Sequence, residues 1–173
     1  MSLGIIKNKE ICIILIQNIF IFKAGIALVN QNFGQCHALG NEINLVSSYL
    51  YAIQQISLEI TGTSIKSLNL EKIAFHFYRD PNDSNMFYVV VTDVDDDLEE
   101  IDFKIHRIAE IFDKNYKDYL QEFHGNIVPF RNFRDILINM NIAQRNCGGG
   151  SECEECAHND DLSEIGNIFD DLD

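Results

Sequence analysis

The sequence has little positive charge, and this deficit excludes several kinds of partner. Its 173 residues contain 13 Lys and Arg against 27 Asp and Glu, a formal net charge of −14. A surface that follows the phosphates of DNA or RNA needs clustered basic residues, and so does electrostatic attachment to an anionic membrane. We therefore expect no nucleic-acid partner and no membrane attachment of that kind.

An apolar run long enough for a transmembrane helix is also missing. The run Ile11–Phe22 has 12 residues and is interrupted by Gln17 and Asn18, whereas a transmembrane helix needs about 20 residues. No small-residue cleavage site follows it, so a signal peptide is not indicated. We interpret this run as a buried central strand and expect no transmembrane segment.

Catalytic motifs are missing as well. The sequence contains no P-loop, no nucleophile elbow, no zinc-protease motif and no dinucleotide-binding glycine motif. Cys36 and His37 have the chemistry of a nucleophile and a base, but adjacent side chains seldom face each other. His76 alternates with Phe75 and Phe77, which places it on the solvent-facing side of a strand. The sequence therefore predicts a protein that is not an enzyme.

The acidic residues are unevenly distributed, and this marks a boundary. Residues 147–173 contain nine acidic residues and no Lys or Arg. Hydrophobic residues make up 46% of the chain, enough for a substantial core. We therefore expect a folded domain over residues 1–146 and a flexible acidic tail over residues 147–173.

The hydrophobic pattern predicts five strands and three helices. The expected elements are strands over Ile11–Phe22, Ile26–Phe33, Ile65–Leu70, Ile73–Tyr78 and Met86–Val94, a helix within residues 39–62, a second helix capped by Asp97 and ended by Gly125, and a last helix over Phe130–Met140 with Pro129 in its first turn. The turn Lys23-Ala24-Gly25 joins the first two strands, because glycine suits a tight hairpin.

Apolar residues recur at helical spacing in both long helices. In the first helix they are Ile43, Val46, Leu50, Ile53 and Ile60, widened by Leu45, Tyr49 and Ile56. In the second helix they are Leu98, Ile101, Ile105, Ile108 and Phe112, continued by Tyr116, Leu120 and Phe123. Core packing explains most of the aromatic residues at these positions and in the strands.

The order of elements predicts an α+β fold. The first and fifth strands are the most uniformly apolar, and a strand buried on both faces must be central, with helices on both sides of the sheet. We expect these two strands to be neighbours in a five-stranded antiparallel sheet. The first helix would cross from one sheet edge to the other, and the later helices would cover the opposite face, in the order β-β-α-β-β-β-α-α.

This arrangement resembles the longin-like, or SNARE-like, domain family of the profilin-like superfamily. The resemblance covers about Ile11 to Leu137 and rests on the stretches IQNIFIFKAGIALVNQNFG, INLVSSYLYAIQQISLEI, MFYVVVTDVDDD and IAEIFDKNYKDYLQEFHGNIVPFRNF. The spacing of Phe112, Tyr116 and Leu120 is similar to the second helix of archaeal members. Profilin-like and roadblock-like domains have similar elements, but two strands followed by a helix favour the longin type.

The resemblance implies a non-catalytic protein-interaction module in the cytoplasm. Longin-like domains act in vesicle trafficking, in tethering, and in complexes that bind or regulate small GTPases. The expected partner is a small GTPase or another longin- or roadblock-type domain, in a homo- or hetero-dimer. The contacts expected are a sheet edge and a helix face. Five cysteines, three of them clustered, also fit a reducing compartment better than a secreted protein.

The stretch CGGGSECEECAH offers a possible metal site. Cys147, Cys153, Cys156 and His158 supply three sulfurs and one imidazole, a tetrahedral set suited to zinc. These ligands all lie within twelve residues, whereas strong zinc sites separate two ligand pairs. The alternatives are an inert flexible tail and a redox-active Cys-x-x-Cys pair. A metal- or redox-responsive sensor is therefore the alternative function.

The chain after this stretch has a second pattern. Leu162, Ile165, Phe169 and Leu172 would share one face of a helix, surrounded by acidic residues. This pattern is typical of a short segment that folds when it binds a groove with a basic rim. The alternative is a solubilising acidic tail.

Overall fold

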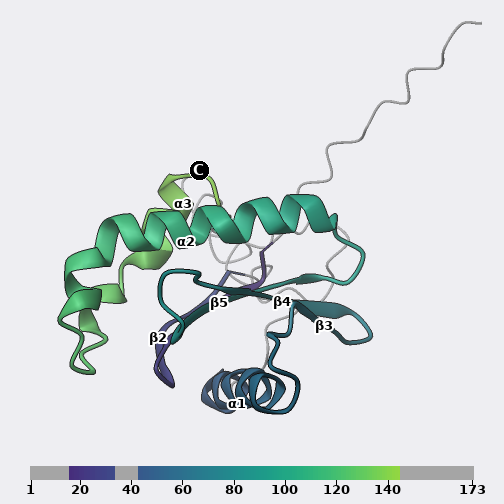
Figure 1. The fold of residues 1–173 in the computed structure, drawn as a ribbon. Helices are drawn as coiled ribbons and strands as arrows, with labels where there is room; N and C mark the ends of the chain where they lie inside the picture. Colours follow the sequence, from purple (N-terminus) through teal and green to yellow (C-terminus); the bar gives the residue numbers. More distant parts are fainter. Residues whose placement is uncertain (1–15, 34–42, 145–173) are drawn as a thin grey trace, which may run out of the picture.

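The computed structural model describes residues 16–33 and 43–144, which form a sheet between two helical layers (Figure 1). The strands are β1 (Asn18–Lys23), β2 (Ile26–Asn32), β3 (Ser67–Asn69), β4 (Ile73–Arg79) and β5 (Met86–Asp93). The helices are α1 (Ile43–Thr61), α2 (Leu98–Gln121), the 3₁₀ turn η1 (Val128–Phe130) and α3 (Phe133–Asn139). The predicted α+β fold with a five-stranded sheet is confirmed.

The strand order also agrees with the prediction. The order across the sheet is β2-β1-β5-β4-β3, and every neighbouring pair is antiparallel. The two most apolar strands, β1 and β5, are therefore adjacent in the centre, with Phe20 opposite Val89. α1 connects the edge strand β2 to the edge strand β3, while α2 and α3 cover the other face (Figure 1).

Each face of the sheet has its own apolar core. On the α2 side, Tyr88 of β5 packs with Phe112 and Tyr116 of α2 and with Phe130 and Phe133. The rings of Phe112 and Phe133 meet edge to face with centroids 4.9 Å apart. A core of this size on one side explains why α2, η1 and α3 pack as one layer.

The α1 side has a smaller core. Phe22 of β1 and Phe87 of β5 stack with centroids 4.7 Å apart, and the ring of Tyr51 covers Phe87 at 5.7 Å. Leu50 is fully buried beside them. The hairpin turn joins this core, because a Cβ added at Gly25 would lie 3.5 Å from the Tyr51 ring.

Several predicted details are wrong. His76 does not face solvent: it is buried, because α2 covers that face of β4, and its Nε2 lies 3.2 Å from Thr92 Oγ1. The third strand is shorter than Ile65–Leu70. The expected last helix is divided into η1, which contains Pro129, and α3. Leu98, the first residue of the predicted α2 stripe, is exposed.

Candidate partner-binding surface

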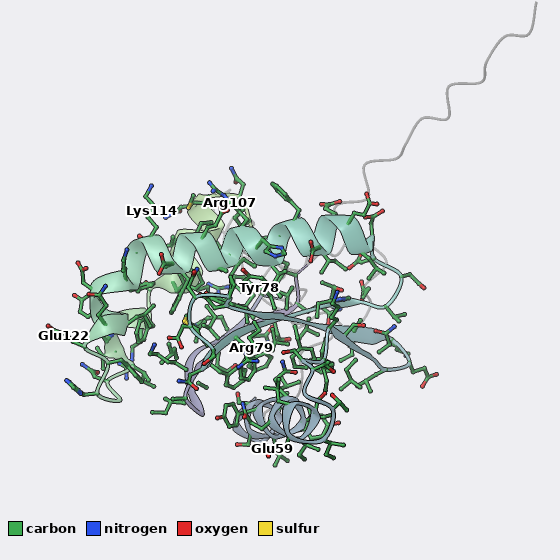
Figure 2. All side chains as sticks on the ribbon, in the orientation of Figure 1. Glu59, Tyr78, Arg79, Arg107, Lys114 and Glu122 are labelled. Atoms are coloured by element: carbon green, nitrogen blue, oxygen red, sulfur yellow. The ribbon has the colours of Figure 1, made fainter. Side chains whose placement is uncertain are left out.

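α1 differs from α2 in its lack of charge. Among its 19 residues Glu59 is the only charged residue, whereas α2 has ten charged residues among 24. Figure 2 shows Glu59 on α1, and Arg107 and Lys114 on the outward side of α2. A helix on a protein surface normally carries polar residues on the side that faces away from the core, and α2 follows this rule while α1 does not.

The outward side of α1 is apolar instead. At about 100° per residue, Leu45, Tyr49, Ile56 and Ile60 fall within a stripe about 60° wide, whose centre lies about 110° from Leu50 and about 170° from Ser47. These four residues, called here the outer face of α1, are 68, 52, 56 and 78% exposed. The sequence predicted one apolar stripe on this helix. The structure divides its residues between a buried side and an exposed side, and Ile60 lies on the exposed side.

The opposite side of α1 is held firmly on the sheet. Besides the ring contacts of Tyr51, Ser47 Oγ accepts a hydrogen bond from Asn30 Nδ2 of β2 at 3.3 Å. Near its other end, Gln54 Oε1 accepts a hydrogen bond from the Ile65 N–H at 3.1 Å. These contacts fix the rotation of the helix, so the outer face is presented outward in a single orientation.

The sheet edge beside α1 adds main-chain groups to this surface. Among the described strands β2 pairs only with β1, so its other edge borders no strand. Ile26, at the start of β2, is 40% exposed. An edge strand offers unpaired N–H and C=O groups to an incoming chain. The open edge of the sheet lies beside the helix that carries the outer face, because α1 contacts β2 through Ser47 and Asn30.

Two titratable groups among the described residues make structural contacts. Burial lowers the pKa of His76, which keeps its ring neutral beside Thr92. A hydrogen bond from Lys23 lowers the pKa of Asp83 and joins the start of the β1–β2 turn to the turn before β5. No group of three or more His, Cys, Asp or Glu residues in residues 16–33 and 43–144 is arranged to hold a metal ion.

The site residues predicted from the tail lie outside the described residues. This holds for the candidate zinc ligands Cys147, Cys153, Cys156 and His158, and for the candidate partner-binding residues Leu162, Ile165, Phe169 and Leu172. The metal- or redox-sensor hypothesis stays a prediction; one zinc per chain, lost in Cys153→Ser, would support it. The helix face expected from the sequence was not assigned to a particular helix, although the single charge in 19 residues distinguishes α1.

In comparisons with known proteins, no family model matches the chain, and no curated protein matches its sequence. None of the helices in the part of the chain that the structure describes is long and apolar enough to cross a membrane.

Proposed function

We propose that this protein is a non-catalytic protein-interaction module that binds its partner through the outer face of α1 and the neighbouring edge of β2. The observation that supports the proposal is the outer face itself: four large apolar side chains, each more than half exposed, on a helix with one charge. Contiguous exposed apolar patches mark interaction surfaces in folded proteins.

The energetic argument also favours a bound partner. Full burial of a large apolar side chain contributes about 1.5–3 kcal/mol. Since these side chains are already partly covered, each has about 1–2 kcal/mol left to gain from contact with a partner. An exposed ion pair contributes only about 0–1 kcal/mol. The four apolar side chains of α1 can therefore supply more binding free energy than a contact made through one charged pair on the surface of α2.

The resemblance to longin-like domains suggests the class of partner. It points to a small GTPase or a second longin- or roadblock-type domain, in a cytoplasmic complex of the tethering or trafficking kind. An apolar helix face beside an open sheet edge suits a folded partner, since it offers side-chain and main-chain contacts together.

Two matched variants test the proposal. Ile56→Asp places a charge on the outer face, and Phe103→Asp places the same charge on α2, where Phe103 is 70% exposed. Each tagged full-length chain is purified from its native host, and the co-purifying proteins are quantified. We expect the main partner to contain a GTP-binding or longin-type subunit, and its yield to fall about tenfold or more in Ile56→Asp, since 1.4 kcal/mol is tenfold in affinity.

The control decides the outcome. Phe103→Asp should retain the partner, and both variants should unfold at the temperature of the wild type. Equal retention in the two variants, or equal loss, would contradict a role for the outer face of α1.

A further inference from the structure

A cleft lies at the edge of the sheet formed by β3 and β4, next to the first half of α2. It has a volume of about 720 Å³ and lies between the first half of α2, the segment that leads into β3, and the last residues of β4. β3 pairs only with Ala74–His76 of β4. The last hydrogen bond along this edge runs from the Phe77 N–H to the Lys66 carbonyl. The edge of β4 beyond Phe77 therefore borders the cleft.

The lining of the cleft is apolar at its centre. Leu98 of α2 is 67% exposed, and Ile101 and Ile105 continue the same wall toward the interior. At the far end, His106 packs edge-on against the Tyr78 ring with centroids 4.2 Å apart. Figure 2 shows Tyr78 between β4 and α2, so this ring pair closes the cleft on that side.

The rim of the cleft carries a net positive charge. Its lining includes Lys66, Arg79 and a single carboxylate, that of Asp102. The Arg79 guanidinium also donates hydrogen bonds to the Ser84 carbonyl at 3.0 and 2.9 Å. His76 adds no charge, because burial lowers its pKa. In a chain whose formal charge is −14, a positive rim around an apolar centre selects for acidic partners.

The two other candidate surfaces lack this combination. The neighbouring hollow beyond Tyr78 has a volume of about 650 Å³ and is lined by Asp80, Asp83, Glu110 and Asp113 against Lys23 and Lys117, so its net charge is negative. The outer face of α1 has no basic residue. Of these three surfaces, the cleft is therefore the best matched to an acidic apolar segment.

We propose that residues 162–172 of the same chain bind in this cleft, with Ile165 and Phe169 against the apolar wall of α2 and the surrounding carboxylates near Lys66 and Arg79. The segment has the required chemistry, since its apolar residues fall on one helical face and acidic residues flank them.

The connecting chain is long enough for this contact. The described chain ends at Gln144, shortly after α3, and α3 lies on the same side of the sheet as α2 (Figure 1). Residues 145–162 span up to about 60 Å when extended, whereas a domain of this size has a radius of gyration of about 14 Å. Tethering also raises the effective concentration of the segment to the millimolar range.

Two variants of the full-length chain test this contact by nuclear magnetic resonance. Phe169→Asp adds a charge to the apolar side of the segment, and Asn167→Asp adds the same charge on the opposite side. We expect Phe169→Asp to shift the amide signals of residues 64–67, 77–79 and 98–106. Asn167→Asp should leave these signals in place. Lys66→Glu, at an exposed position on the rim, should shift the signals around Phe169.

The remaining outcomes overturn the proposal. If Phe169→Asp changes only signals of neighbouring tail residues, the segment is not bound to the domain. Shifts on α1 in place of the cleft would assign the segment to a different surface. If tenfold dilution of the wild type moves its cleft signals to their positions in Phe169→Asp, the contact is between chains. That result would contradict binding within one chain.

Discussion

Substitution of Leu50 by alanine tests whether α1 has one buried side and one free side. Leu50 is fully buried in the core on the α1 side of the sheet, next to Phe22 and Phe87. Removal of a buried leucine side chain costs about 2–5 kcal/mol, because the lost transfer free energy adds to that of the cavity. We expect Leu50→Ala to lower the free energy of unfolding by about 3 kcal/mol.

The matched substitution on the outer face is Ile60→Ala. Ile60 is 78% exposed, and substitutions at such positions change stability by about 0.5 kcal/mol or less. Alanine is also the better helix former, so the change should be neutral or slightly stabilising. Both substitutions remove a large apolar side chain from the same helix, and the two positions differ in burial, since Leu50 is 0% and Ile60 78% exposed.

Equilibrium unfolding in urea measures the difference. With a slope of about 2 kcal/mol per molar, Leu50→Ala should shift the midpoint down by about 1.5 M, and Ile60→Ala should leave it within about 0.3 M. The slopes should agree with the wild type. An equal loss in the two variants would refute the reasoning, because it would show that the outer face is buried within the chain's own core.

Two further substitutions test local contacts. Asp97→Ala removes the oxygen that accepts hydrogen bonds from the N–H groups of Glu99 and Glu100 at the start of α2, and should cost about 1 kcal/mol in urea unfolding; an equal loss in Asp95→Ala would argue against the cap. Burial holds the pKa of His76 below its ordinary value of 6.5, so the unfolded chain binds the proton more tightly and stability falls as the pH drops below 6.5. His76→Gln should flatten the stability profile between about pH 7 and 5, and a profile unchanged from the wild type would contradict this assignment.

Local signals explain why much of the fold is predictable. The uniformly apolar strands β1 and β5 identify the centre of the sheet, because only a strand covered on both faces tolerates such composition. Asp97 identifies the start of α2, since its carboxylate accepts the first free N–H groups. The hairpin at Gly25 follows from the positive φ of 86° that glycine adopts readily. Each of these signals lies within a few residues of the feature it predicts.

The rotation of α1 could not be predicted in this way. Periodicity identifies the buried side of a helix only when the other side is polar, and α1 carries large apolar residues on its exposed side as well as on its buried side. Leu50 and Ile60 therefore look equivalent in the sequence, although one is fully buried and the other is 78% exposed. His76 is a similar case, since its alternation with phenylalanines does not reveal that α2 covers the opposite face of β4.

Hydrogen exchange of the full-length chain, with and without its purified partner, tests the proposed interface most directly. We expect the partner to slow exchange in α1 and along β2, and to leave the outward side of α2 unchanged. Slower exchange confined to α2 and α3, with α1 unaffected, would contradict the assignment of the outer face of α1 as the partner-binding surface.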